Sequence, residues 1–344
     1  MLRTLEIATN IRIPDCRPSY SYCFTTHVEN ILYLQAVTDV FYGGVLCHYF
    51  LTRYFLISIA QATRMMSPLI TYCMFMLMDR KIGFIGLGNM ATAMIGGMLQ
   101  KGIAAPEDII GSARTETTVE KVKTKFNINT TTDNKIVAAQ ADILFLAVKP
   151  IFFPEVIDQI KDVVTEDTLI VSIAAGRTLD YLKEAFGRPE LKLIRCMPNT
   201  PALVLEGCTG VCAEENVTEE DMEQVLALLR SFGIASVVPE RLMDVVVGVS
   251  GSSPAYVFMF IEAMADEAVA AGMPRKQAYE FAAQSVLGSA RMVLETGRHP
   301  GELKDMVCSP GGTTIQAVKV LEEKGMRAAV MDAMDACIEK SKSM

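Results

Sequence analysis

The stretch RKIGFIGLGNMATAMIGGMLQKG, residues 80–102, decides the fold of this chain. A short apolar run at 82–85 is typical of a buried parallel strand, and apolar residues recur at helical spacing from Met90 onward. Between them stands G-x-G-x-x-A, whose first glycine permits a sharp turn and whose second lets backbone approach a pyrophosphate. An ordinary tight turn is the alternative. The position between a strand and a helix favours a dinucleotide-binding unit.

The residues that follow continue this alternation of strands and helices. Apolar runs predict strands and amphipathic stretches predict helices, the strands at 108–113, 141–148 and 167–175 and the helices at 115–126 and 154–164. The order is typical of an α/β fold with a Rossmann-type, doubly wound parallel sheet, whose ligands lie at the carboxyl ends of the strands. We therefore expect binding residues just past each strand, at Gly86–Met90, Ser112–Arg114, Val148–Pro150 and Ala174–Gly176.

The end of the second predicted strand discriminates between two cofactors. A site for NADH usually has Asp or Glu there, which accepts from the ribose 2′-hydroxyl. Here the residues are GSART, with a hydroxyl at Ser112, a cation at Arg114 and no acid. This pattern favours the 2′-phosphate of NADPH, with NADH as the alternative cofactor. The other interpretation is that Ser112 and Arg114 belong to a solvent-exposed loop with no ligand.

Composition excludes several classes of protein. The net charge of −8 and the pI of about 5.1 argue against a nucleic-acid partner, and no basic stripe is present. The nine cysteines form no C-x-x-C pair and the chain has only three histidines, so we expect no metal. We interpret the thiols as reduced, in a cytoplasmic protein.

Residues 1–77 differ from the rest of the chain. They contain no lysine and twelve of the 25 aromatic residues. A membrane anchor fits best at 41–60, but Arg53 lies inside that segment and would cost about 2.5–3.5 kcal/mol there. A targeting peptide would lack acids such as Glu6. We favour an extension of doubtful origin, a start-site artefact ahead of a true start near Met78, and expect no membrane association.

From residue 254 onward the sequence predicts helices, at 254–273 and 274–297, then a short helix and a last one that begins at SPGGTT. The segment 254–273 is apolar on nearly all faces, so we expect it to be deeply buried. A second subunit is the simplest cover for its surplus apolar face, which predicts an obligate homodimer.

Two polar loops complete the pattern. In CSPGGTTIQAV, residues 308–318, a glycine pair opens a helix and leaves free N–H groups at the positive end of its dipole, which suits an anion. In RCMPNTPA, residues 195–202, Asn199 and Thr200 stand between two prolines. A well-made turn and a rigid polar corner beside a nicotinamide are both open interpretations of that second loop.

Taken in order, these motifs resemble those of the pyrroline-5-carboxylate reductases: IGFIGLGNMA, FLAVKP, RCMPNTPA, SGSSPAY and HPGELKDMVCSPGGTT. The resemblance runs from about Met78 to the C-terminus. It implies an NADP-binding Rossmann-like domain at 78–240 and a helical dimerisation and substrate domain at 241–344. Two positions depart from the family pattern, Ser253 where glycine is usual and Leu87 where alanine is frequent.

The resemblance also implies roles for individual residues. The cofactor would be held by residues at the strand ends, namely Gly86, Leu87, Gly88, Asn89 and Met90 at the pyrophosphate, Ser112 and Arg114 at the 2′-phosphate, Asn134 near the adenosine ribose, and Val148, Lys149, Ala175 and Asn199 along its path. The substrate carboxylate would be bound by Ser309, Gly311, Gly312 and Thr313. Thr314 would be the catalytic residue, through a hydrogen bond to the imine nitrogen, unless its hydroxyl only caps its helix. The implied reaction is reduction of Δ1-pyrroline-5-carboxylate to L-proline with NADPH, the last step of proline biosynthesis, in a dimer that can assemble into larger rings.

Three alternatives stay open from the sequence. A β-hydroxyacid dehydrogenase would need a lysine in the helical domain, and the segment 248–264 has none. A reductase of another cyclic imine, such as a six-membered ring, is harder to exclude. A dimer that binds NADPH without catalysis is the third. The sequence does not decide assembly beyond the dimer or feedback by proline.

Overall fold

The strand–turn–helix unit predicted for 80–102 is present. The computed structural model describes residues 80–343, which all belong to one compact unit, so the predictions made for residues 1–77, including the apolar segment 41–60, lie outside the described chain. Strand β1 (Ile82–Ile85) is buried throughout and leads through the glycine turn into helix α4 (Asn89–Gln100). The boundary between domains at residue 240 stays a prediction.

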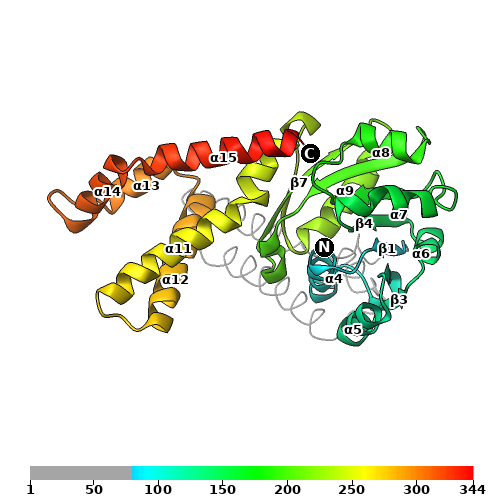
Figure 1. Cartoon of the computed structure of the whole chain (residues 1–344), viewed down its shortest axis with the longest axis horizontal. Coiled ribbons are helices and arrows are strands. Elements are labelled where there is room, and N and C mark those ends of the chain that lie inside the picture. The colour runs from blue at the N-terminus through cyan, green and yellow to red at the C-terminus, as the bar shows by residue number, and fades with distance from the viewer. Residues whose placement is uncertain (1–79, 344) are drawn as a thin grey trace, which may run out of the picture. The chain divides into compact units, whose positions relative to one another are not determined.

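Eight strands form one sheet in the order β3-β2-β1-β4-β5-β6-β7-β8 (Figure 1). The remaining strands are β2 (Ile109–Ser112), β3 (Asn129–Thr131), β4 (Ile143–Leu146), β5 (Leu169–Ser172), β6 (Lys192–Met197), β7 (Gly207–Ala213) and β8 (Gly233–Val237). Every neighbouring pair is parallel except β6 and β7, which are antiparallel. The connection 198–206 is too short for the crossover that parallel neighbours need, so the chain returns in the opposite direction. The doubly wound parallel sheet is confirmed, with this one reversal.

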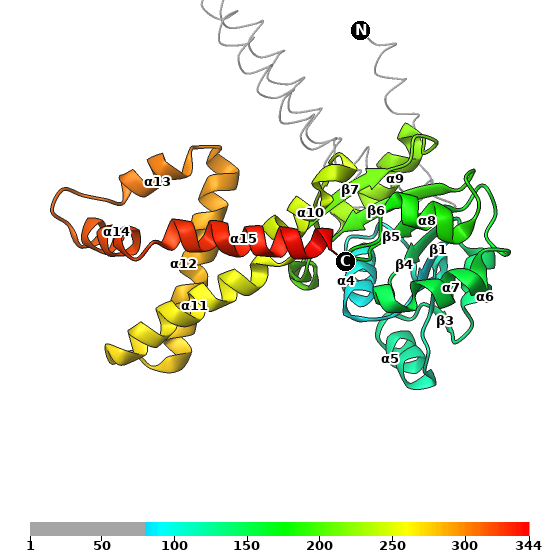
Figure 2. The same cartoon turned by 45° about the horizontal axis from the view of Figure 1, so that its top comes forward.

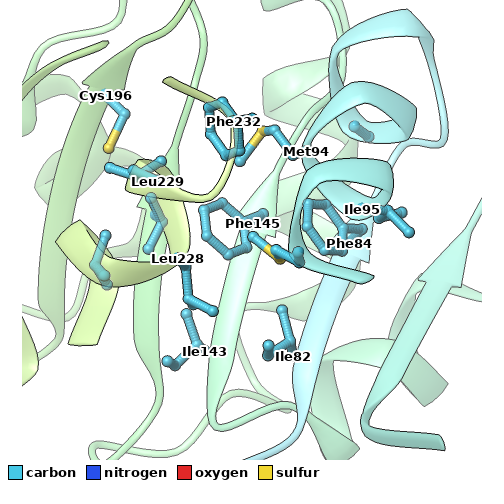
Figure 3. Close-up of a cluster of buried hydrophobic side chains, with 14 of the residues drawn as sticks. Ile82, Phe84, Met94, Ile95, Ile143, Phe145, Cys196, Leu228, Leu229 and Phe232 are labelled. Atoms are coloured by element: carbon cyan, nitrogen blue, oxygen red, sulfur yellow. The ribbon is translucent and has the colours of Figure 1, made fainter. Parts of the chain in front are cut away.

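Strand residues alternate between two apolar cores, one on each face of the sheet. In β4, Ile143 and Phe145 contribute to the core beneath α4 and α9 (Glu219–Arg230), where Phe145 stacks on Phe84 with ring centroids 4.8 Å apart (Figure 3). Leu144 and Leu146 contribute to the other core, formed with α6 (Asn134–Gln140), α7 (Phe153–Ile160) and α8 (Leu179–Phe186). Helix α5 (Glu116–Phe126) adds Val122 to the first core. Burial on both faces explains the continuous apolar strands.

A buried carboxylate fastens the end of the sheet opposite the glycine turn. Asp221, only 3% exposed, accepts from Arg80 Nη1 at 3.2 Å, from Lys192 Nζ at 2.8 Å and from the Thr218 hydroxyl at 2.8 Å. Burial by itself raises the pKa of Asp221, but the hydrogen bonds from Lys192 and Thr218 and the charge of Lys192 outweigh it and lower the pKa below its ordinary value. Asp221 is therefore ionised in the folded protein and joins β1, β6 and α9.

The C-terminal region is helical, as predicted. It comprises α10 (Met243–Val246), the π-helical turn η5 (Val247–Gly251), α11 (Ser253–Ala270), α12 (Arg275–Thr296), α13 (Pro300–Met306), α14 (Thr313–Glu323) and α15 (Met326–Lys342). Helices α11 and α12 pack along each other, and α15 contacts α10, η5 and α14 (Figure 2).

Residues 80–343 alone do not bury the segment 254–273, whose surplus apolar face the sequence assigns to a second subunit. In α11 only Ala265 is buried, whereas Phe258 and Met259 are 62% and 69% exposed. Large apolar side chains of α12 and α15 are exposed as well, among them Phe281, Leu294 and Met331. The helices of residues 80–343 do not enclose this apolar surface by themselves, so it needs a cover from outside those residues.

Candidate active site

The glycine turn after β1 offers an open, positively polarised helix start. Gly86 has φ +98°, and a Cβ there would lie 2.7 Å from the Ala147 carbonyl oxygen and 2.8 Å from Val148 Cγ1. Gly88 caps α4 without any side-chain hydrogen bond, and no atom lies within 4 Å of the position where its Cβ would be. The first N–H groups of α4 are thus free and unobstructed, as a pyrophosphate requires.

Leu87 turns its side chain away from that open space. It is 4% exposed and belongs to the core beneath α4. A Cβ added to Gly111 of β2 would lie 2.5 Å from Leu87 Cδ2, so the leucine fills the room that the glycine leaves. The absence of a side chain at Gly111 therefore makes room for leucine at position 87, where alanine is frequent in the family. Only its backbone is available for the predicted role at a pyrophosphate.

The end of β2 holds a chain of three hydrogen-bonded polar side chains. The buried Ser112 hydroxyl donates to Asn134 Oδ1 at 2.7 Å, and Asn134 Nδ2 donates to Gln159 Oε1 at 2.7 Å. The one hydroxyl proton of Ser112 is therefore engaged, whereas Asn134 keeps a second N–H for a ligand. The structure thus brings two of the predicted cofactor residues, Ser112 and Asn134, into direct contact.

Arg114 lies at the surface, two residues after Ser112. Its guanidinium is 4.8 Å from the centroid of the Phe152 ring, which follows β4. An exposed guanidinium held by an aromatic ring suits a phosphate at the end of β2. Sequence reasoning missed both Phe152 and Gln159. Each contacts a partner that is distant in sequence, Arg114 for Phe152 and Asn134 for Gln159, and neither belongs to a recognised motif.

The ends of β4 and β5 supply the next predicted residues. Val148 lies against the glycine turn, and Lys149 is exposed just before a 3₁₀ turn at Pro150–Phe152. Ala175 is partly exposed after β5, and Arg177 Nη2 donates to the Pro150 carbonyl at 3.3 Å, which ties the two strand ends together. These positions share the carboxyl edge of the sheet with the glycine turn.

Asn199 also lies at this edge, but its side chain is engaged within the protein. Its Oδ1 accepts from the Cys208 N–H at 2.8 Å, and its Nδ2 donates to the Ser250 carbonyl at 2.9 Å. The residue is 7% exposed. A direct role in cofactor binding stays a prediction, and the observed bonds join three elements of the chain.

The predicted substrate loop leads into a second helix whose N-cap residue is a glycine and makes no side-chain hydrogen bond. Gly312 caps α14 without a side-chain hydrogen bond, and a Cβ there would collide with Ser309 Oγ. Gly311 has φ +69°, which favours glycine. Thr313 is exposed and Thr314 is partly exposed in the first turn of α14. Among residues 80–343, no hydrogen bond joins the segment 309–314 to the glycine turn.

Comparison with known proteins decides the family. The family model for pyrroline-5-carboxylate reductase dimerisation matches residues 240–344, and the model for NADP oxidoreductase, coenzyme F420-dependent, matches residues 81–176. The pyrroline-5-carboxylate reductase of Escherichia coli is 56% identical over 267 residues, which cover 78% of this chain and 99% of that protein. The chain belongs to the pyrroline-5-carboxylate reductase family. This membership removes the β-hydroxyacid dehydrogenase alternative.

Other pyrroline-5-carboxylate reductases agree in sequence and in fold. The enzyme of Methanosarcina acetivorans is 46% identical over 77% of this chain and 98% of its own length. The solved structure of the Coxiella burnetii enzyme has a TM-score of 0.72 at 35% identity and covers 77% of this chain and 98% of its own. That of Plasmodium falciparum, solved with NADP bound, has a TM-score of 0.69 at 33% identity, with the same coverage.

The family match bears on the apolar helices. Residues 240–270 form a helical stretch that is long and apolar enough to cross a membrane by length and composition alone. The same stretch lies inside the segment that matches the reductase dimerisation model.

Ser253, the other departure from the family pattern, begins α11, and among the described non-glycine residues only Asn127 and Leu205 have positive φ. A serine at 253 therefore introduces no backbone strain.

Proposed function

We propose that this chain reduces Δ1-pyrroline-5-carboxylate to L-proline with NADPH, as the last step of proline biosynthesis. The observation that carries the proposal is a pair of uncapped helix starts in one reductase-family chain. Neither Gly88 at the start of α4 nor Gly312 at the start of α14 makes a side-chain cap hydrogen bond, and at Gly88 no atom lies within 4 Å of the position of a Cβ. Each suits one of the two anionic ligands of the reaction, a dinucleotide and a small ring acid.

The strand ends fit NADPH. The free N–H groups at Gly88, Asn89 and Met90 would bind the pyrophosphate, and Arg114 with the Asn134 amide would bind the 2′-phosphate and the ribose. When bound, the cofactor supplies a hydride to the imine carbon, and the protein supplies orientation. No acid at the end of β2 competes with a 2′-phosphate.

The start of α14 would bind the substrate carboxylate. The N–H of Thr313, the first residue of α14, and the Ser309 hydroxyl would be the donors, because the Gly312 N–H already donates to the Ser309 carbonyl at 3.0 Å. Hydrogen bonds to a charged group contribute about 1.5–3 kcal/mol each, and the helix dipole adds about 0.3–1 kcal/mol. The Thr314 hydroxyl would then hydrogen-bond the imine nitrogen and hold or relay its proton, a role worth at most about 10²–10⁴-fold in rate.

We propose that the exposed faces of α11, α12 and α15 form a homodimer interface, which can extend to a ring of dimers in a cytoplasmic enzyme. The match of 240–344 to the reductase dimerisation model supports a protein partner as the cover for the apolar side chains, in preference to a membrane. Sedimentation of the purified protein tests the assembly. A stable monomer would contradict the proposal.

The deciding experiment is consumption of NADPH on addition of pyrroline-5-carboxylate. Thr314→Ala should lower turnover while the dissociation constant for NADPH is unchanged, and Thr314→Ser, which keeps the hydroxyl, is the matched control. Cofactor binding without turnover by the unmodified protein would favour a non-catalytic NADPH-binding dimer. Equal rates with a six-membered cyclic imine acid would contradict the assigned ring size.

A charge reversal tests the cofactor preference. Arg114→Asp should weaken NADPH far more than NADH, because only NADPH carries the 2′-phosphate that the guanidinium would bind. The ratio of the two dissociation constants is the measurement. Equal losses would place the 2′-phosphate elsewhere.

A further inference from the structure

Asn199 pairs with the turn that starts the helical region. Its amide nitrogen donates to the carbonyl of Ser250, 51 residues later, at 2.9 Å, and its amide oxygen accepts from the N–H of Cys208 at 2.8 Å. One side chain thus links the residues after β6, the start of β7 and the π-helical turn η5. Both Asn199 and Ser250 are 7% exposed, so protein groups must satisfy their polar atoms.

The Ser250 carbonyl needs this outside donor because of Pro254. In a continuous α-helix the carbonyl of residue 250 would accept from the N–H of residue 254. Residue 254 is proline, which has no N–H. The local backbone is a π-helical turn, in which the Ser252 N–H donates to the Val247 carbonyl at 2.8 Å, and such turns are frequent at functional sites. The Asn199 amide therefore donates the hydrogen bond to the Ser250 carbonyl that Pro254 cannot donate.

This bond joins the two halves of the proposed reaction site. Asn199 follows β6 at the carboxyl edge of the sheet, and the 3₁₀ turn after it, Thr200–Val204, packs against α4, the helix whose start is open at Gly88. Ser250 lies in η5, three residues before α11 begins, within the region that carries α14. A change in the backbone at Ser250 is therefore a change in how the substrate-binding helices leave the cofactor-binding sheet.

We infer that Asn199 is a positioning residue, which fixes the turn η5 that leads into α11 so that the helical region holds its substrate groups in the orientation the reaction needs. The inference rests on the proposed function. It replaces direct cofactor contact as the role of Asn199. Without the donor, fewer molecules hold the competent arrangement, and the apparent affinity for substrate falls by that fraction while the affinity for NADPH does not.

Two substitutions at residue 199 test the inference. Asn199→Ala removes both hydrogen bonds, and Asn199→Asp keeps the acceptor for Cys208 but removes the donor to Ser250. We expect both to raise the KM for pyrroline-5-carboxylate, by about 5- to 50-fold, with the dissociation constant for NADPH within about 2-fold of the unmodified enzyme. A residue that only stabilised the fold would lower the amount of active enzyme and leave KM unchanged.

Pro254→Ala provides the matched rescue, because it returns an N–H at the position that a helix would use. In the Asn199→Ala background it should bring KM back to within about 3-fold of the Pro254→Ala enzyme. Additive effects, or an unchanged KM in the single variants, would overturn the inference. A dissociation constant for NADPH that rises with KM would make Asn199 a cofactor ligand.

Hydrogen exchange gives a readout that needs no turnover. Amides of residues 250–257 should exchange faster in Asn199→Asp and return toward the original rate when Pro254→Ala is added. Unchanged exchange would refute the positioning role. Failure of the unmodified enzyme to reduce pyrroline-5-carboxylate would instead refute the proposed function and leave this exchange result intact.

Discussion

Two alanine substitutions in the glycine turn should separate cofactor binding from stability. At Gly88, φ −78° and ψ −172° suit alanine, and no atom lies within 4 Å of the added methyl. Loss of entropy in the unfolded chain stabilises such a variant by about 0.4–1 kcal/mol, and alanine is a poorer N-cap than glycine by a similar amount. The free energy of unfolding of Gly88→Ala should therefore stay within about 1 kcal/mol of that of the unmodified protein.

Gly86→Ala should behave in the opposite way. Its φ of +98° is unfavourable for alanine, and the methyl would lie 2.7 Å from the Ala147 carbonyl oxygen, a backbone atom that cannot rotate away. Backbone strain of about 1–3 kcal/mol and overpacking of about 1–3 kcal/mol add to roughly 2–6 kcal/mol of lost stability. Because 1 kcal/mol corresponds to about 2–4 °C in a chain of this size, Tm should fall by at least about 4 °C.

Cofactor binding gives the contrast. The Gly88 methyl occupies the space that the pyrophosphate would enter, so NADPH should bind about 10- to 150-fold more weakly, the value of one charged hydrogen bond. The assay is titration of nicotinamide fluorescence, with Tm measured on the cofactor-free protein at one concentration. Gly96→Ala is the control in the same helix, since its methyl would make an ordinary contact, 3.5 Å from Phe126. Undiminished binding of NADPH by Gly88→Ala would refute the assigned position of the pyrophosphate.

Three further substitutions or treatments probe the fold. Gly111→Ala should destabilise the protein by about 1–3 kcal/mol through its contact with Leu87, and far less in a Leu87→Ala background, as a double-mutant unfolding cycle would show. Asp221→Asn should cost about 1–3 kcal/mol at neutral pH. Because the folded pKa of Asp221 is lowered from 3.8, its contribution is present above that value and is lost as the pH falls through the folded pKa, so unfolding curves of the two proteins should converge in acid. Burial raises the pKa of Cys212 to about 12 and raises that of Cys196 as well, so iodoacetamide should modify neither in the folded enzyme at about pH 8, as mass spectrometry would report.

Local patterns made much of the fold predictable. The apolar run, the glycines and the helical spacing of 80–102 are contiguous, and the structure places β1, the turn and α4 where that pattern predicts them. The reversal of β7 was not predictable in the same way, because a strand has the same composition in either direction. The short connection 198–206 imposes that direction.

The residues of the site were also only partly predictable from the sequence. Residues that act through their own backbone, such as Gly86 and Gly88, are legible in a motif. Residues that act on a distant partner are not, and Gln159 is recognisable only once its bond to Asn134 is seen. The apolar sequence of α11 indicates that its surface will be covered, but not by what, and residues 80–343 leave most of that surface exposed.

The order of the elements along the chain matters for how the protein is made. Among residues 80–343, every strand of the sheet precedes residue 240, and the exposed apolar helices α11, α12 and α15 follow it. If the predicted boundary at residue 240 separates two domains, the sheet can fold on the ribosome before the apolar helices emerge, since domains fold as units from the N-terminus during synthesis. The exposed apolar faces of α11, α12 and α15 are thus synthesised after the sheet that they follow in sequence.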